Sequence, residues 1–479
     1  MNLVIDGRKP ASLFRFFEEI SAIPRPSYHE EKIADYLVAF AKERGLECYR
    51  DASHNVLIKM HATKGKEGVP PILFQGHTDM VCEKNADVEH DFLKDPIKLV
   101  VDGKMLRAKG TTLGADNGVA VATMLAILDG EIDVHPAVEC LFTTAEEVGL
   151  DGANSFDYNR ISARRLVNLD SEELNLVTAG CAGGVRSDIV VPCKIKPLSG
   201  SSIRVSVSGL MGGHSGANIN SGRANANKLM GRLLSALYQT QQIALISLAG
   251  GSKDNAIPRE CEAILAVSDL DAAIDLIADT AAEIANELSQ DDKGFCVVCE
   301  ETEAGEVMMD AASTLRILSF LSGVQSGVIT MSPYVKGLVE FSRNLSVIKT
   351  EGETVSFVLS TRSSMESQLE ASINELTLLA KLLGASIHHH GRYPGWSYAK
   401  ESAIRDAYLA AHRAVTGRDA EVNAIHAGLE CGIISSKLPG MDMISVGPDM
   451  FDIHSPDEAL DLESVEKFWQ IIETLVKNL

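Results

Sequence analysis

Basic residues are scarce in this 479-residue sequence. It contains 44 Lys and Arg against 66 Asp and Glu, which gives a formal net charge of −22. Proteins that bind nucleic acids through the phosphate backbone, or that bind anionic membranes, need a basic surface. We therefore expect no nucleic acid and no membrane among the partners of this protein.

Long apolar stretches are also missing. The most apolar one, Val119–Leu128, is ten residues long and contains a Thr, whereas a helix needs about 20 residues to span a bilayer. Residues 1–10 show no basic segment followed by an apolar one, the pattern of a secretory signal. The sequence therefore favours a cytoplasmic protein.

The nine cysteines are odd in number and scattered, so they predict no disulfide framework. Cys296 and Cys299 form a single C-x-x-C inside the strand-like run 295–299. One such pair without a second is weak evidence for a zinc site. We expect two buried cysteines in a strand.

The remaining composition, 45% hydrophobic and 23% charged, is typical of a globular protein with a large core. Helix and strand patterns alternate over the first third of the chain, as in an α/β domain. Beyond about residue 181 a half-exposed strand (201–208) and a helix (224–237) are predicted, followed near the end by a strand (443–446) and a helix (463–476). The elements predicted in the first third are helices from about residues 13 and 31, a Ser27–Glu30 capping box before the second helix, strands at 55–60, 72–75, 138–143 and 166–169, and an apolar helix to about residue 128 after the turn 114–118.

His and acidic side chains recur where these strands end and where the apolar helix begins. The side chains are His77, Asp79, Asp116, Glu146, Glu147 and Asp170. Loops at the carboxyl ends of strands are where α/β folds hold their sites. A single acid at such a place is usually a helix N-cap, and His77 alone also suits a solvated loop. Four such places in succession indicate a functional site.

The chemistry of this set suits metal ions. Adjacent carboxylates such as Glu146 and Glu147 repel each other unless a cation or a proton shares the site, and one of such a pair commonly serves as a general base. Asp79, two residues after His77, can accept a hydrogen bond from the second ring nitrogen of a metal-binding histidine. His, Asp and Glu ligands with a bridging carboxylate suit two zinc-like ions that act in hydrolysis.

These motifs resemble the two-metal exopeptidase family that includes carboxypeptidases, tripeptidases and carnosine-type dipeptidases, and within it the branch that cleaves Xaa-His dipeptides. Each matching segment is short, but their order along nearly the whole chain is specific. The segments are 76–81, 114–119, 144–149, 168–172, 212–216, 255–258, 361–362, 426–430 and 452–456. The turn Tyr393–Trp396 also looks typical of that branch.

The resemblance implies a fold and a division into domains. We expect an α/β, zinc-exopeptidase-like catalytic domain, with a mixed sheet flanked by helices, formed by residues 1–180 and 398–479. Residues 181–397 are expected to form an inserted α+β lid domain. The insert has 217 residues, which suggests two lid subdomains, one of them in the place that a partner's lid fills in dimeric relatives.

The resemblance also assigns roles at the metal site, where one carboxylate is expected to bridge the two ions. The expected ligands are His77, Asp116 and Asp170 for one ion and Asp116, Glu147 and His454 for the other. Asp79 would orient His77 from behind, and Glu146 would be the general base.

Five further residues are expected, by resemblance, to bind the substrate. His214 would stabilise the developing oxyanion. Asn255 and Arg362 would hold the backbone polar groups and the terminal carboxylate of the peptide, since a guanidinium can bind both carboxylate oxygens. Gly428 and Glu430 would line the floor of the site. Without the resemblance, His214 also suits a glycine-rich turn with no further role.

The implied activity is metal-dependent hydrolysis of unblocked dipeptides, including Xaa-His dipeptides such as β-alanyl-histidine. Zinc is the expected metal, with manganese or cobalt as alternatives, because carboxylate and His ligands accept several divalent ions. A small peptide is the expected partner, and a homodimer is one assembly open to the chain. Two alternatives stay open: a tripeptidase or N-acyl amino acid deacylase on the same scaffold, and a non-catalytic binding protein.

Overall fold

The computed structural model describes residues 4–479 and divides into two compact units. Unit 1 contains the chain up to Cys181, Trp396–Ala424 and Leu429–Leu479, and unit 2 contains Ala182–Gly395 and Ile425–Gly428. The sequence predicts that the segment Ile425–Gly428 belongs to the catalytic domain. It lies in unit 2 because the Ala182 amide donates to the carbonyls of Ile425 and Ala427, at 3.1 and 3.0 Å. The subdivision of the insert into two subdomains stays a prediction.

Unit 1 is built on a mixed sheet. Its strands, in spatial order, are β1 (Glu47–Arg50), β2 (Val56–Met60), β6 (Val138–Thr143), β3 (Ile72–His77), β7 (Arg165–Asn168), β23 (Asp442–Ser445), β8 (Leu176–Cys181) and β22 (Glu421–Ile425). The central strands β6, β3, β7 and β23 are parallel to one another, and β1, β2 and β8 pair antiparallel. Parallel strands end at the same edge of a sheet, so the loops after β3, β6 and β7 are neighbours.

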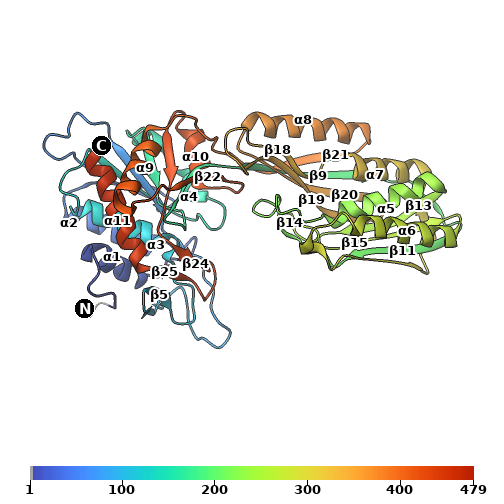
Figure 1. Ribbon diagram of the computed structural model, residues 1–479, viewed down its shortest axis with the longest axis horizontal. Coiled ribbons are helices and arrows are strands. Elements are labelled where there is room, and N and C mark those ends of the chain that lie inside the picture. The colour runs from blue at the N-terminus through green and yellow to red at the C-terminus, as the bar shows by residue number, and fades with distance from the viewer. Residues whose placement is uncertain (1–3) are drawn as a thin grey trace. The chain divides into compact units, whose positions relative to one another are not determined.

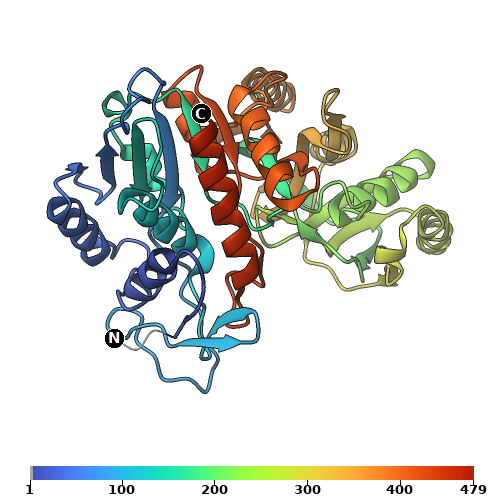
Figure 2. The ribbon, with the colours of Figure 1, turned by 60° about the vertical axis from the view of Figure 1, so that its left-hand side comes forward.

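Helices pack against this sheet and bury its apolar residues. They are α1 (Ala11–Ser21), α2 (Glu31–Glu43), α3 (Ala115–Leu128), α4 (Asp151–Ser155), α9 (Ala403–Thr416), α10 (Glu430–Lys437) and α11 (Leu462–Asn478). Helix α3 is buried along nearly its whole length and packs on α1 and β3, which explains why its sequence is apolar on every side. Figure 2 shows α11, in red, running beside the orange α9. A small sheet of β4 (Leu99–Asp102), β5 (Met105–Ala108), β25 (Ala459–Asp461) and β24 (Met450–Phe451) completes the unit.

Unit 2 is built on a continuous antiparallel sheet. Its strands, in spatial order, are β16 (Cys296–Glu301), β11 (Ser201–Ser208), β15 (Cys261–Val267), β13 (Ile243–Gly250), β19 (Val339–Glu351), β20 (Thr354–Ser363), β9 (Gly183–Pro192) and β21 (Ser386–Tyr393), and β18 (Gly327–Met331) also pairs with β19. Two short ribbons lie beside it: β12 (Gly213–His214) with β14 (Ala256–Ile257), and β10 (Ile195–Pro197) with β17 (Val307–Met309).

Four helices of unit 2 share one hydrophobic cluster with this sheet. They are α5 (Ala226–Thr240), α6 (Leu270–Ala285), α7 (Ala311–Gly323) and α8 (Glu366–Leu382). Figure 1 shows these helices running alongside the strands. The apolar alternation predicted at 201–208 is observed in β11, where Ile203, Val205 and Val207 point into the cluster.

Two local predictions are wrong. Cys296 is exposed, and Cys299 is half-buried on the other face of the edge strand β16, so the two cysteines neither lie together in the core nor face a common ligand. Residues at odd spacing in a strand point to opposite faces. The Ser27–Glu30 capping box is also not formed: α2 begins at Glu31 without a side-chain cap, and the Ser27 hydroxyl donates to Asp79.

The described residues, 4–479, include no helix that is long and apolar enough to cross a bilayer.

Candidate metal and substrate site

His77, the last residue of β3, lies at the centre of the first ligand group. Its Nε2 is 3.1 Å from Asp116 Oδ1 and 3.4 Å from Asp170 Oδ1. The other ring nitrogen, Nδ1, is 3.3 Å from Asp79 Oδ1. His77 and Asp79 are almost completely buried, so the carboxylate of Asp79 can fix the ring orientation in the way that a metal-binding histidine requires.

Asp116 also belongs to a second ligand group. Its Oδ2 is 3.0 Å from His454 Nε2, and the same nitrogen is 3.1 Å from Glu147 Oε1. One oxygen of Asp116 therefore faces His77 and the other faces His454. His454 and Ala145, next to Glu146, have positive φ angles of 62° and 50°. Residues other than Gly adopt this conformation at a cost and are often found at functional sites.

The donor atoms fit two divalent cations. In each of the groups His77–Asp116–Asp170 and Asp116–Glu147–His454, one ligand atom per residue lies within 4.8 Å of the others. The side chains offer imidazole nitrogen and carboxylate oxygen, which are ligands for Zn²⁺, and carboxylates also suit Mn²⁺. The sequence-predicted ligands are thus brought together, with Asp116 common to both groups.

Glu146 lies beside this cluster, and its donor atom also falls within reach of His77 and Glu147. Burial, together with the negative charge of Asp170, raises the pKa of Glu146 well above its usual range, while His77 acts in the opposite direction. A raised pKa favours the protonated form of a carboxyl group. Burial likewise raises the pKa of Asp170, to about 6.

Two buried residues that the sequence analysis did not single out hold the loop before Asp116. The Arg25 guanidinium donates to the carbonyls of Thr78 and Asp79, at 2.9 and 3.1 Å, and to that of Gly114. A Cβ on Gly114 would lie 2.6 Å from the same guanidinium, so only glycine fits there. Glu458, four residues after His454, accepts hydrogen bonds from the amides of residues 113, 114 and 115, at 2.7, 3.0 and 2.8 Å. Glu458 lies two residues after the matching segment 452–456, whereas Arg25 lies outside all matching segments.

In unit 2, His214 lies at the end of the ribbon strand β12. Its Nδ1 accepts hydrogen bonds from the amides of Gly216 and Ala217, at 3.3 and 3.1 Å. Because Nδ1 is the acceptor, the neutral ring carries its proton on Nε2. Burial and the charge of Arg362 lower the pKa of His214, so the ring is a neutral Nε2–H donor near pH 7.

Arg362, on β20, is 8% exposed. It donates to the Tyr393 hydroxyl at 2.7 Å, and among residues 4–479 its Nε has no hydrogen-bond partner. The Nε2 atom of His426 and the Ser342 hydroxyl form a hydrogen bond of 2.7 Å. Burial, then the charge of Arg362, lowers the pKa of His426 to about 4. His426 had no predicted role, although its segment belongs to the matching ones.

The other predicted substrate residues differ in their surroundings. Asn255 is exposed, and its backbone carbonyl accepts a hydrogen bond from the Ser215 amide at 2.8 Å. Gly428 lies against the ring of Tyr393, which a Cβ would approach to 3.1 Å.

Glu430 is fully buried in unit 1 and accepts hydrogen bonds from Gln75 and Thr143. Burial raises its pKa to about 8. A side chain enclosed in this way offers no open surface to a substrate. Glu430 thus lies enclosed beside β3 and β6, and its role at the floor of the substrate site stays a prediction.

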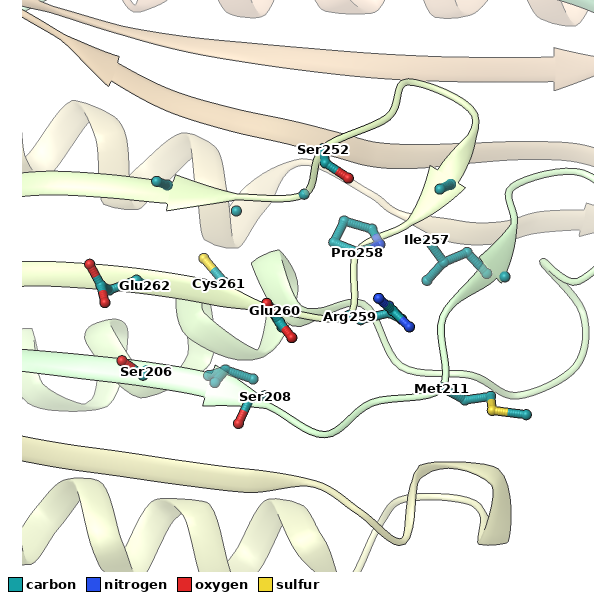
Figure 3. A pocket seen from close by; sticks show the side chains of 16 residues that line it. Ser206, Ser208, Met211, Ser252, Ile257, Pro258, Arg259, Glu260, Cys261 and Glu262 are labelled. Atoms are coloured by element: carbon teal, nitrogen blue, oxygen red, sulfur yellow. The ribbon is translucent and has the colours of Figure 1, made fainter. Parts of the chain in front are cut away.

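A cavity of about 770 Å³ lies elsewhere in unit 2, between the ends of β11, β13 and β15 and the ribbon β12–β14 (Figure 3). Its lining includes Arg259, Glu260 and Glu262 as well as serines and apolar side chains. None of the predicted ligands or substrate residues lines it. Gly213 and Ala256, the neighbours of His214 and Asn255 in the ribbon β12–β14, do line it.

The chain belongs to peptidase family M20/M25/M40, whose family model matches residues 73–478. This confirms the predicted family and fold class, and it makes the protein a peptidase.

Individual relatives match along the whole chain. The cytosol non-specific dipeptidase of Escherichia coli (strain K12) is 38% identical over 474 residues, which cover 98% of each chain. The crystal structure of aminoacylhistidine dipeptidase from Vibrio alginolyticus superposes with a TM-score of 0.95 at 37% identity, covering 99% of this chain and 97% of that one. Aminopeptidase PepT from Bacillus cereus, at 16% identity and a TM-score of 0.58 over 98% of each chain, shares the fold.

Proposed function

We propose that this peptidase is a metal-dependent dipeptidase that hydrolyses unblocked dipeptides, Xaa-His dipeptides such as β-alanyl-histidine among them. The observation that carries the proposal is the pair of ligand groups that share Asp116, with Glu146 beside them. The near end-to-end similarity to a non-specific dipeptidase and to an aminoacylhistidine dipeptidase supports the substrate class.

His77, Asp116 and Asp170 would hold one divalent ion, and Asp116, Glu147 and His454 the other. When bound, such ions supply Lewis acidity and lower the pKa of water to near neutrality. Zinc is the proposed metal, with manganese or cobalt as alternatives, since the ligand atoms are nitrogen and oxygen only. Asp79 would fix the tautomer and orientation of His77.

Glu146 would act as the general base and then as the general acid. Its carboxylate would take the proton of the attacking water and deliver it to the leaving amine. The raised pKa that burial gives this carboxyl suits both steps. His214 would donate its Nε2–H to the developing oxyanion, because the amides of Gly216 and Ala217 hold its Nδ1 as an acceptor.

Arg362 would bind the terminal carboxylate of the peptide. It is held by Tyr393 while its Nε stays free of other partners among the described residues. A guanidinium that is partly satisfied and mostly buried suits a planar anion with two oxygens. Asn255 would bind the peptide backbone, and Gly428 would let the backbone of its segment come close to the substrate.

The cellular setting and assembly are also proposals. Similarity to a relative described as cytosolic supports a cytoplasmic location. A homodimer is proposed as the assembly, and sedimentation of the active protein over a range of concentrations tests it.

The function is tested with a panel of dipeptides, tripeptides and N-acetyl amino acids, applied to chelator-stripped protein to which Zn²⁺, Mn²⁺ or Co²⁺ is restored. We expect dipeptides with a free amino group, β-alanyl-histidine included, to be cleaved fastest. Faster cleavage of tripeptides or of N-acetyl amino acids would replace the proposal with a tripeptidase or a deacylase. Metal binding without any turnover would indicate a binding protein.

A further inference from the structure

The loop between β6 and α4 carries both Glu146 and Glu147, and side chains from outside the loop hold four of its successive amides. The Thr144 amide donates to Asn55 Oδ1 at 3.1 Å. The Ala145 amide donates to Glu30 Oε1 at 2.8 Å. The amides of residues 146 and 147 donate to the two oxygens of Asp79, at 3.1 and 3.2 Å.

The three acceptors come from different parts of unit 1. Glu30 directly precedes α2, Asn55 precedes β2 and Asp79 follows β3. Their exposed fractions are 2%, 0% and 0%. Buried amides that lose such an acceptor stay unsatisfied, and hydrogen bonds to a carboxylate are stronger than those between neutral groups.

Asn55 and Asp79 also serve other groups. The side-chain amide of Asn55 donates to the Gly152 carbonyl at 2.9 Å. Asp79 faces the His77 ring and accepts from the Ser27 hydroxyl at 2.8 Å. Glu30 holds the amide that directly precedes Glu146, at the residue with a φ of 50°. A positive φ costs free energy at an alanine, so a contact from outside the loop must stabilise the backbone conformation of Ala145.

We infer that Glu30 is a positioning residue for Glu146: its buried carboxylate holds the Ala145 amide and thereby sets the direction in which Glu146 leaves the loop. The inference rests on the proposed function, in which Glu146 is the base. Ser27 supports the same arrangement through Asp79. The Ser27–Glu30 pair that the sequence suggests as a helix cap thus stabilises the catalytic loop.

The test compares three substitutions at Glu30 in the metal-loaded protein. Glu30→Gln keeps an oxygen acceptor at the same reach, Glu30→Asp keeps the charge but withdraws the oxygen by one methylene, and Glu30→Ala removes the acceptor. Glu31→Gln changes an exposed neighbouring acid and is the matched control. For each variant, kcat and KM for a dipeptide and the metal content are measured separately.

We expect kcat of Glu30→Ala and Glu30→Asp to fall about 10- to 100-fold, as for residues that orient an active group from behind. The KM and the metal content should change little. Glu30→Gln and Glu31→Gln should stay within about twofold of the wild type. Wild-type kcat in Glu30→Asp, or equal losses in Glu30→Asp and Glu30→Gln, would overturn the inference; Glu30→Asp keeps the test decisive if Glu30→Ala does not fold.

Hydrogen exchange of metal-free protein gives a readout that does not depend on activity. Residues 144–147 should exchange faster in Glu30→Asp than in Glu30→Gln, while α3 stays unchanged. If the wild type cleaves no peptide, the proposed function fails and the exchange result alone decides the inference. If the wild type is active and the loop exchanges equally in both variants, only the inference fails.

Discussion

The two units present opposite chemistry. Unit 1 gathers His77, Glu147 and Asp170, which lie at or after the ends of the parallel strands β3, β6 and β7, with Asp116 and His454 from other segments. This cluster needs cations to offset its charge. Unit 2 places Arg362 near His214 and His426, and burial together with the positive charge of Arg362 lowers the pKa of both histidines. The first set is suited to hold metal ions and move protons, and the second to receive an anion. If the proposed roles hold, the hydrolytic groups and the carboxylate-binding groups belong to separate structural units.

Removal of metal should have the largest effect of the changes considered, and it should affect unit 1 alone, because all proposed metal ligands lie in that unit. After chelation and dialysis, peptide cleavage should fall to background and return when a divalent ion is added. A ligand at a concentration of 100 Kd stabilises the folded state by about 2.7 kcal/mol. Hydrogen exchange should therefore accelerate in the loops 113–116 and 144–147 but not in β19 and β20. Full activity in protein shown by elemental analysis to lack metal would refute the metal site.

Glu146→Gln should separate metal binding from chemistry within unit 1. The amide cannot take the proton of water, so kcat should fall by a factor of about 10²–10⁴, the usual contribution of general acid–base catalysis. The metal content should equal that of the wild type. Glu131→Gln, at an exposed acid, is the control. Turnover of Glu146→Gln near the wild-type rate would show that another group is the base.

Arg362→Ala should sharpen the role of unit 2. Loss of a charged hydrogen-bonding group costs about 1.5–3 kcal/mol, which corresponds to a KM about 10- to 100-fold higher for a dipeptide. Arg362→Lys should restore part of the affinity, because an ammonium cannot bind both carboxylate oxygens at once. A dipeptide amide, which lacks the carboxylate, should show a much smaller difference between wild type and variant. Equal effects on the acid and the amide would contradict the proposed contact.

The smallest expected effect concerns His426 and pH. Its pKa is about 4 in the folded protein, lowered by burial first and then by Arg362, with His214 acting in the same direction and the Val339 backbone opposing. The unfolded chain has a His pKa of about 6.5. The unfolded state therefore binds more protons between these values, and stability is lost as pH falls from about 6.5 towards 4. One such group should lower the free energy of unfolding by about 1–2 kcal/mol between pH 7 and pH 5.

Urea unfolding at pH 7 and pH 5 measures this pH dependence of stability in the wild type and in His426→Gln. The variant cannot gain the proton, so its loss of stability between the two pH values should be smaller. Equal losses would show that His426 is not the group responsible. The metal-free form is the suitable sample for both proteins, because metal binding is itself dependent on pH.

Much of unit 1 could be predicted because its signals are local. The apolar runs that give β3, β6 and α3 depend on residues a few positions apart. The burial of Glu430 and the exposure of Cys296 could not be predicted in this way. Each depends on which strand or helix covers the residue, and that is decided by packing between segments far apart in the sequence.

The same distinction holds for the site. The sequence by itself determined which residue types are present, their order and their places at the ends of strands, and through the resemblance their expected roles. Only the tertiary structure decided that Asp116 faces two histidines, that His214 carries its proton on Nε2, and that Glu30 holds the Ala145 amide rather than capping α2. The physical reason is range. Propensity and periodicity act over a few residues, whereas the contact between residues 30 and 145 exists only once the sheet and its helices have packed.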